Sequence, residues 1–498
     1  MEDFQMVVKG ALLHDIGKLI QRSEENPSDK THGQWGYEWL QKFFGDDPSI
    51  NSTITHHSHD KEVFKSNYSI IWYEADNISS SERKQEGDNE KGRWDMYTAL
   101  TSPFFKIRNP KDLSESLTEI PYLQLKYTEK IKSVSFQKPD ISFKTYEQIR
   151  KDLENDLNIA KEYKPYSINF LLMLFEKHLS NVPSITLEIS KSGEENIKKH
   201  PDISLFSHSK LAAAVAGCLY HFMRETYPEK WKSNELLKDE ILNQPPDVKP
   251  FLLIGGDISG VQKFIYTITS KGALRSLKGR SFYLELLTEH AISELLEELM
   301  LTRCNIIFAG GGRFYLISHN TPSAINSILS VGKRIDEFLF NEFKGNLQLH
   351  IAYVPFRKES FQNAVPIWRE ISTSLELLKR RKWEKRLYDV LRVESQHEDC
   401  FTESCEICFR EDAPLVDLQR VDDTIKVCNA CYSQYQLGSF LTQISKANYP
   451  VMYKLSSKPS SDFIKIEDWY YHFRTGGDEN IHKNAKAVYR INDFNAKH

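Results

Sequence analysis

The stretch FLLIGGDISG, at residues 251–260, decides how the middle of the chain folds. Its first six residues are typical of a short buried strand, and a helical segment is expected from Gly260 to about Thr269. The following sequence predicts a helix at about 279–300, strands at 305–309 and 314–318 around a glycine turn, a helix at 322–343 and a strand at 347–354. The order β-α-β-β-α-β is the ferredoxin-like arrangement, so we predict such a domain over residues 246–356.

The region before this domain, residues 1–245, is predicted to be helical and begins with a helix from Phe4 to about Arg22. Asp15 lies among the apolar positions of this helix, and His14 borders them. A carboxylate on the inward face of a helix is costly unless a cation or hydrogen-bond donors meet it. The pattern therefore indicates a charged or donating partner beside Asp15.

Two further helices bring polar residues toward the same core. Asp47-Pro48 is an N-cap followed by a proline favoured in the first turn, and it opens a helix that ends at His56-His57. A helix at 69–83 has Asp76 beside its inner apolar stripe. One more histidine, His32, lies between the first helix and Asp47-Pro48. The candidate ligands are therefore His14, Asp15, His32, His56, His57 and Asp76.

Imidazoles and carboxylates are the ligand set of divalent transition metals, and a bridging aspartate suits a two-metal site. We expect Mn, Ni or Co there, activating water for attack on a phosphodiester, with His14 and Asp15 as catalytic ligands. Lys18, one turn beyond His14, is expected to steady the phosphate. The alternative is that these are ordinary polar residues that cap helices.

A cysteine cluster lies near the other end of the chain. Cys405 and Cys408 form one Cys-x-x-Cys pair, Cys428 and Cys431 form another, and nineteen residues separate the pairs. This spacing predicts a four-cysteine zinc site, structural because four sulfurs leave no open position. A redox pair would need only one such motif. The surrounding region, residues 357–485, is expected to be helical.

The composition limits the class of protein. With 498 residues the chain needs several cores, and with 40% hydrophobic residues it is globular rather than disordered. A net charge of −4 argues against binding nucleic acid by overall basicity. We find no apolar run of membrane-spanning length and no signal peptide, so we expect no membrane association and a cytoplasmic location.

Several stretches, in this order, resemble one known family. They are GALLHDIGKLIQR (10–22), the THxxxG element (31–36), HH (56–57), YEADNISSSER (73–83), ISLFSHSKLAAAVAGCLY (203–220), GGDISGVQKFIYTITSKGALRSLKGRSFYLELL (255–287) and AGGGRFYLIS (309–318). The chain resembles the large, polymerase-like subunit of type III-A CRISPR effector complexes, the Csm subtype. The fold implied is α+β and multidomain: a helical HD phosphohydrolase domain, a ferredoxin-like palm and a small four-cysteine zinc-binding domain.

The resemblance also implies a function. Subunits of this family join a guide RNA and other Csm-type subunits, and binding of a target RNA activates them. Their HD domain then cuts single-stranded DNA, and a pair of palm domains converts ATP to cyclic oligoadenylate. The family's metal-binding residues correspond here to the six candidate ligands named above.

The palm in this chain lacks part of what catalysis requires. Two-metal chemistry needs carboxylates on the first strand and on the central hairpin, but the chain offers only Asp257 and a hairpin tip, 310–313, without an acid. Ser259, Gly260 and Arg313 are expected to hold ATP at most through backbone donors and a cation. The alternative is that these glycines only make tight turns.

Two segments near the C-terminus bear on a second palm. The string GGDE at 476–479 resembles a catalytic hairpin, but its flanks, YYHFRT and NIHKN, are poor strands, so we interpret it as a turn. Residues 486–498 resemble the start of a second palm with a degenerate acidic pattern at 492–495. We therefore expect the second palm to lie on another polypeptide or to be lost by truncation.

Two alternatives to a CRISPR nuclease subunit remain open at this point. One is a free-standing HD nucleotidase acting on nucleotides or cyclic dinucleotides. The other is a non-catalytic scaffold subunit, which the incomplete palm favours.

Overall fold

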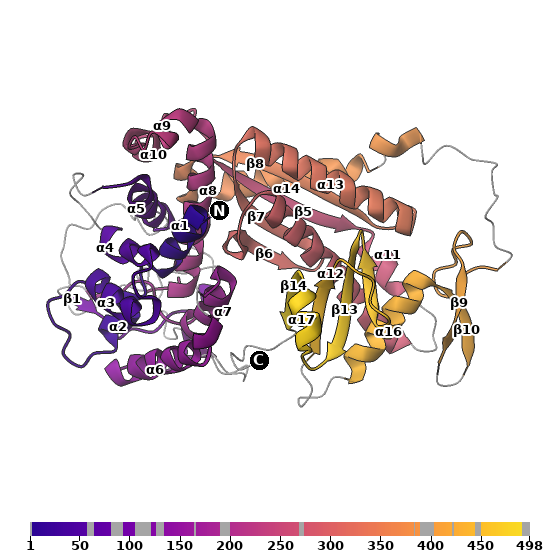
Figure 1. Cartoon of the computed structure of the whole chain (residues 1–498), viewed down its shortest axis with the longest axis horizontal. Helices are drawn as coiled ribbons and strands as arrows, with labels where there is room; N and C mark the ends of the chain where they lie inside the picture. Colours follow the sequence, from indigo (N-terminus) through magenta and orange to yellow (C-terminus); the bar gives the residue numbers. More distant parts are fainter. Residues whose placement is uncertain are drawn as a thin grey trace.

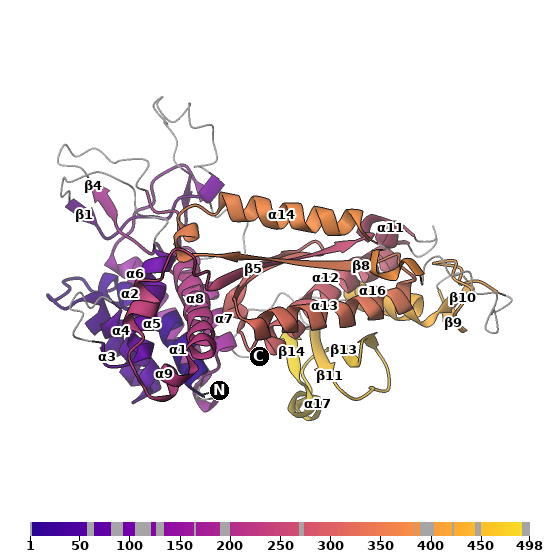
Figure 2. The same cartoon turned by 90° about the horizontal axis from the view of Figure 1, so that it is seen from above.

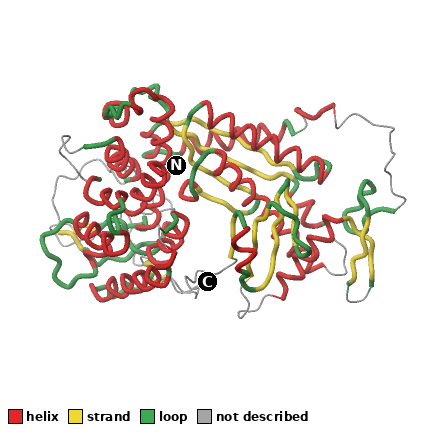
Figure 3. Tube along the Cα trace, in the orientation of Figure 1, coloured by secondary structure: helices red, strands yellow, loops and turns green. Residues whose placement is uncertain are grey.

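The computed structural model describes residues 2–56, 64–80, 93–104, 121–125, 134–163, 166–189, 200–267, 273–382, 384–388, 403–420, 423–443 and 450–490. Helices fill one end of the molecule, and the larger sheets lie in the middle and at the other end (Figures 1 and 3). Within the described residues, we find no helix with the length and apolarity needed to span a bilayer.

The helical end is built around one long buried helix, α8 (Leu205–Thr226), which packs against α1 and α5. The other helices are α1 (Glu2–Leu13), α2 (Gly17–Arg22), α3 (His32–Phe44), η1 (Pro48–Asn51), α4 (Ser52–Thr55), α5 (Asn67–Ser79), α6 (Phe143–Ile159), α7 (Ile168–Leu179), α9 (Pro228–Lys232) and α10 (Lys238–Leu242). Short strands β1 (Arg93–Asp95) and β4 (Leu187–Ile189) pair with each other, as do β2 (Tyr122–Leu123) and β3 (Val134–Ser135).

The first helix is not continuous, and the expectation of one helix from Phe4 to Arg22 is wrong. The chain turns at His14–Ile16, where the Ile16 amide bonds to the Leu13 carbonyl at 3.1 Å. This turn redirects α2 so that it packs on α3, and a Cβ at Gly17 would lie only 1.8 Å from the His32 carbonyl oxygen. The close approach of the two helices requires glycine and therefore a separate α2.

The middle of the molecule confirms the ferredoxin-like prediction. Its elements are β5 (Phe251–Ser259), α11 (Val261–Tyr266), α12 (Ala273–Glu298), β6 (Ile306–Gly310), β7 (Arg313–His319), α13 (Pro322–Phe343) and β8 (Gln348–Phe356). The strands form an antiparallel sheet in the order β6-β7-β5-β8. Helices α12 and α13 cover one face of the sheet, and α14 (Val365–Arg380) covers the other (Figure 2).

The region expected to be helical, 357–485, contains more strand than predicted. Strands β9 (Leu415–Gln419) and β10 (Thr424–Cys428) form a hairpin before α16 (Asn429–Gln443), which packs on α12. A second antiparallel sheet, in the order β12-β13-β11-β14, contains β11 (Pro450–Leu455), β12 (Phe463–Ile466), β13 (Trp469–Thr475) and β14 (Ala487–Arg490). The flank YYHFRT, predicted to be a poor strand, lies within β13, where Tyr471 and Phe473 are buried on one face.

The GGDE string does not form a strand-flanked hairpin. It follows β13 but leads into a helix, α17 (Glu479–Asn484), and the Asp478 carboxylate caps that helix by accepting from the amides of Asn480 and Ile481 at 3.0 and 3.2 Å. Gly476 adopts φ 77°, as a sharp change of direction requires. These features agree with the predicted turn.

Strand β14 pairs with β11 and so belongs to the same sheet as the strands before residue 486. The predicted acidic pattern at 492–495 lies outside the described residues. The domain boundaries at 245/246, 356/357 and 485/486 stay predictions.

The close packing of α2 on α3 gives a first prediction. Gly17→Ala should lower the free energy of unfolding by about 1–3 kcal/mol, because the added methyl overlaps the His32 carbonyl. Thermal denaturation should show a lower melting temperature. Gly477→Ala is the matched control, since a Cβ there meets no atom within 4 Å; equal melting temperatures for the two variants would contradict the proposed contact.

Candidate metal centres

Asp15 is the centre of a buried cluster of histidines. It lies in the turn between α1 and α2, and its side chain is 1% exposed. Its Oδ2 atom lies 3.5 Å from His14 Nε2 and 3.1 Å from His208 Nε2. Its Oδ1 atom lies 3.4 Å from His32 Nε2 and 3.5 Å from His56 Nε2. Each carboxylate oxygen therefore faces its own pair of imidazoles.

A second carboxylate, Asp76 on α5, joins one of these pairs. Its Oδ1 atom lies 3.5 Å from His14 Nε2 and 3.1 Å from His208 Nε2. Two groups of potential ligand atoms result, each within 4.8 Å: His14, Asp15, Asp76 and His208 in one, and Asp15, His32 and His56 in the other. Because Asp15 belongs to both, the geometry is that of two adjoining sites with a bridging carboxylate.

The backbone fixes the orientation of two imidazoles. His14 Nδ1 lies 2.7 Å from the Ala11 carbonyl oxygen, and His56 Nδ1 lies 2.9 Å from that of Ser52. A carbonyl only accepts, so each Nδ1 carries the proton and donates, which leaves Nε2 with its lone pair in the neutral ring. This is how the outer shell of a metal site usually orients a histidine ligand.

The charges at the cluster suit a cation. Burial alone would raise the pKa of Asp15. The nearby Lys18 and, after it, His14 lower this pKa by more than burial raises it, so the pKa lies well below its usual range. Burial also raises the pKa of Asp76, and hydrogen bonds with His14 and His208 outweigh that effect. Burial lowers the pKa of His32 despite the attraction of Asp15. Ionised carboxylates beside neutral imidazoles are the donors that divalent transition metals prefer.

Asp15 Oδ1 gives direct evidence of fit. It accepts no hydrogen bond from the described residues, although it is buried. An orphaned carboxylate oxygen is costly in the interior, and a cation held between it, His32 and His56 would satisfy it. The residues present therefore fit a metal.

Lys18, the predicted phosphate contact, pairs with Asp15: its Nζ lies 2.5 Å from Asp15 Oδ2. Among the predicted ligands, the structure brings His14, Asp15, His32, His56 and Asp76 together. His57 lies outside the described residues.

Sequence reasoning missed His208, which stands near the start of α8 and is 1% exposed. A signal was present, because His208 continues the buried face of α8 formed by Ala212, Val215 and Leu219. A histidine on the buried face of an apolar helix, close to the serine N-cap of that helix, indicates a ligand or a buried hydrogen-bonding group.

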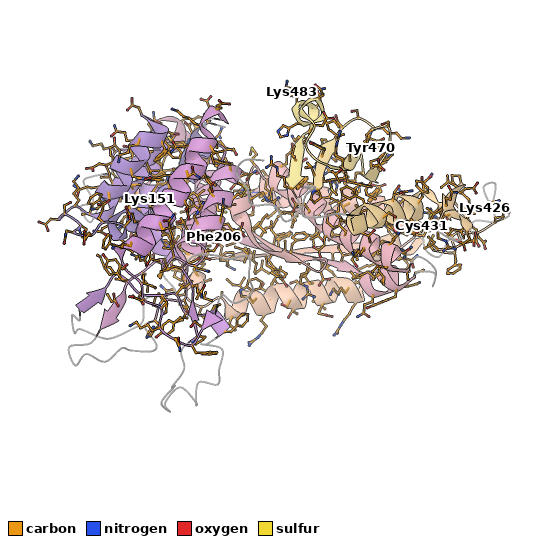
Figure 4. All side chains as sticks on the ribbon, turned by 90° about the horizontal axis from the view of Figure 1, so that it is seen from below. Lys151, Phe206, Lys426, Cys431, Tyr470 and Lys483 are labelled. Atoms are coloured by element: carbon orange, nitrogen blue, oxygen red, sulfur yellow. The ribbon has the colours of Figure 1, made fainter. Side chains whose placement is uncertain are left out.

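The four cysteines converge as predicted. The Sγ atoms of Cys405, Cys408, Cys428 and Cys431 lie within 4.8 Å of one another, and all four are free thiols. Their loops flank the β9–β10 hairpin and the start of α16, and Figure 4 shows Cys431 on the side of this module that faces the palm helices. Four convergent sulfurs are the donor set of a closed, structural zinc site.

Two of the palm residues predicted to hold ATP, Arg313 and Gly260, have other structural roles. The carboxylate of Asp257, 7% exposed, pairs with Arg313 at 2.6 Å and with Lys379 at 2.9 Å. Gly260 adopts φ 90°, and a Cβ there would lie 1.8 Å from the Asn346 carbonyl oxygen. Gly260 thus has a structural reason to be glycine, and the single palm acid is already neutralised.

Known proteins share these features. The family model described as the HD domain matches residues 2–81, and that of the Csm1 subunit domain B matches residues 250–396. Relatives named CRISPR system single-strand-specific deoxyribonuclease Cas10/Csm1 (subtype III-A) include those of Methanocaldococcus jannaschii (30% identical over 92% of this chain and 61% of the relative) and Enterococcus italicus (29%, over 84% and 55%).

Solved structures show the same fold. The apo Csm1–Csm4 cassette superposes with a TM-score of 0.65 at 21% identity, covering 96% of this chain and 56% of the matched chain. The cassette in complex with one ATP gives 0.66 at 22% identity, covering 95% and 56%. The present chain thus spans between 55% and 61% of the length of these relatives and structures. With an HD domain and a Csm1 domain B in this order, the chain is a homologue of the Cas10/Csm1 subunits of CRISPR subtype III-A.

Proposed function

We propose that the helical domain is a metal-dependent phosphodiesterase that cuts single-stranded DNA. One observation carries the proposal: Asp15 turns one carboxylate oxygen to His14 and His208 and the other to His32 and His56. A bridging carboxylate between two histidine-lined sites is what two-metal hydrolysis of a phosphodiester uses.

The residues divide between two metal positions. His14, His208 and Asp76 would hold one metal, His32 and His56 the other, and Asp15 both; His57 stays a predicted ligand. The histidine-rich set favours Mn, Ni or Co over Mg, which prefers oxygen ligands. A bound metal supplies a Lewis acid and lowers the pKa of its water.

Substrate would reach the site past Lys18 and His32. The side chains of these two residues are 18% and 20% exposed, whereas those of Asp15, His14, His56 and His208 are at most 2% exposed. Lys18 Nζ, already beside Asp15 Oδ2, would move to a phosphate oxygen and steady it there.

The names of the relatives support the substrate and the partners. They are named as single-strand-specific deoxyribonucleases of subtype III-A, and the two structures compared above are Csm1–Csm4 cassettes. We propose that this chain works with a guide RNA and other Csm-type subunits and that target RNA activates it. A cytoplasmic location stays a prediction.

A free-standing nucleotidase is the second candidate function. Measuring the turnover of single-stranded DNA and of mononucleotides by the same protein distinguishes the two, because a nucleotidase would prefer the mononucleotides. A non-catalytic scaffold is less consistent with the site, because a scaffold has no use for two carboxylates buried among imidazoles. Burying such charges costs several kcal/mol each, roughly, unless they are compensated.

The nuclease proposal predicts the effect of ligand removal. His14→Ala with Asp15→Ala, and separately His208→Ala, should lower Mn-dependent cleavage of labelled single-stranded DNA by roughly 100-fold or more. A chelator should abolish cleavage by the wild type. His482→Ala, on the exposed side of α17, is the control and should keep full activity. A folded double variant with wild-type activity would refute the site.

The zinc proposal predicts metal content and stability. About one zinc should accompany each purified chain, and Cys405→Ser with Cys428→Ser should lose it and lower the melting temperature, because the module folds around the metal. Cys400→Ser, which changes a cysteine outside the four, should keep the zinc. A well-folded wild type without zinc by elemental analysis would reject the assignment.

For the palm, we propose a supporting role in cyclic oligoadenylate synthesis. Ser259, Gly260 and Arg313 would contribute to an ATP site only if a second palm is supplied, because Arg313 is paired with Asp257. The isolated chain should therefore make no cyclic oligoadenylate from ATP with Mg or Mn and activating RNA, as chromatography of the products would show. Product that disappears in Asp478→Ala would contradict both this proposal and the assignment of GGDE as a turn.

A further inference from the structure

A buried serine, Ser79, lies beside two of the candidate metal ligands. It is the last residue of α5 and follows Asp76 by three positions, so the two side chains lie on the same face of that helix. Helix α5 packs against α8, which carries His208 near its start (Figure 2). Only 1% of Ser79 is exposed. A hydroxyl group in such a place needs hydrogen-bond partners inside the protein.

The Ser79 hydroxyl contacts both of these ligands. Its Oγ atom lies 3.0 Å from the Asp76 carbonyl oxygen and 3.3 Å from His208 Nδ1. A carbonyl oxygen only accepts, so the hydroxyl donates its proton to Asp76, and its oxygen is left to accept a hydrogen bond. His208 Nδ1 therefore carries a proton and donates to Ser79, which leaves the lone pair of the neutral ring on Nε2.

The Nε2 atom of His208 faces the metal position that includes both aspartates. It lies 3.1 Å from Asp15 Oδ2, 3.1 Å from Asp76 Oδ1 and 3.2 Å from His14 Nε2. The His14 ring also keeps its proton on Nδ1, beside the Ala11 carbonyl. Four electron-rich atoms therefore converge on one buried point, where a cation placed among them would satisfy all four.

The histidine ligands differ in what holds Nδ1. His14 and His56 donate to backbone carbonyls one turn earlier in the chain, and a carbonyl at that place cannot be removed by changing a side chain. His208 depends on a side chain from another helix. Without that hydroxyl, the ring proton is better placed on Nε2, where it can donate to the two carboxylates. A protonated Nε2 has no lone pair to offer a metal.

We propose that Ser79 is a positioning residue of the metal centre. Its hydroxyl holds His208 in the tautomer that presents Nε2 to the metal position formed with His14, Asp15 and Asp76. Outer-shell partners of this kind change metal affinity by roughly 10- to 100-fold. The proposal rests on the metal site proposed above. It concerns one of the two positions, since His32 and His56 face the other oxygen of Asp15.

The test measures binding of Mn to the full chain, by electron paramagnetic resonance of free Mn and by calorimetry. The variant His14→Ala with Asp15→Ala gives the background from Mn bound elsewhere on the protein. We expect the wild type to bind one Mn at each position of the cluster. Ser79→Ala should weaken binding at one position by roughly tenfold or more and change the other by less than about twofold. Cleavage of single-stranded DNA should fall at limiting Mn and recover as Mn is raised.

Two further variants show whether Ser79 acts through His208. Ser209→Ala is the matched control, because it removes a buried hydroxyl next to His208 in the chain whose Oγ atom has no hydrogen bond with the described residues. It should keep both Mn affinities. His208→Ala should weaken the same position as Ser79→Ala, and the combined variant should bind no more weakly than His208→Ala alone.

The outcomes separate the role of Ser79 from the metal centre itself. Equal Mn affinities of Ser79→Ala and Ser209→Ala, or a lower melting temperature of Ser79→Ala with both affinities unchanged, would overturn the positioning role and leave the metal centre standing. A further loss of affinity when Ser79→Ala is added to His208→Ala would overturn it as well. A wild type that binds no more Mn than the background variant would overturn both this proposal and the proposed nuclease site.

Discussion

The buried charge of Asp15 is the constraint on which the helical half of the molecule depends. An ionised carboxylate at 1% exposure costs several kcal/mol, roughly, unless neighbours compensate it. The compensation comes from separate segments: Lys18 on α2, His32 on α3, His56 after α4 and His208 on α8. Each segment must reach one point, and this explains both the break after α1 and the glycine contact between α2 and α3.

Helix α8 connects this site to the palm. Its start carries His208, and its later part packs on β7, where the Asn305 side chain bonds to the carbonyls of Ala214 and Ile317 at 3.4 and 2.9 Å. A second link joins Lys358, just after β8, to Glu74 at 2.6 Å, two residues before Asp76 on α5. One hydrophobic core runs through both regions. The histidine cluster and the palm are therefore joined by continuous packing and by two polar links.

Local patterns predicted the ferredoxin-like sheet and most of the histidine cluster, because those elements are contiguous and regularly spaced. His208 escaped because it lies 132 residues after Asp76 (208 − 76), and only the fold brings them together. The second sheet, β12-β13-β11-β14, was not predicted for another reason. Its central strand β11 buries Lys454, whose ammonium is neutralised by Glu294 on α12 at 2.6 Å, so a strand interior looked polar in the sequence.

Asp15 and Asp257 show how neighbours decide what a buried carboxylate does. Both are nearly inaccessible, at 1% and 7% exposure. Asp257 is held by Arg313 and Lys379, whose guanidinium and ammonium groups only donate and offer a metal no lone pair. Asp15 is surrounded mainly by imidazoles, and two of these, His14 and His56, donate from Nδ1 to backbone carbonyls and so turn Nε2 toward the carboxylate. The same side chain is therefore placed to hold a metal in one domain and forms a structural ion pair in the other, and the incomplete palm follows from its basic neighbours as much as from its missing acids.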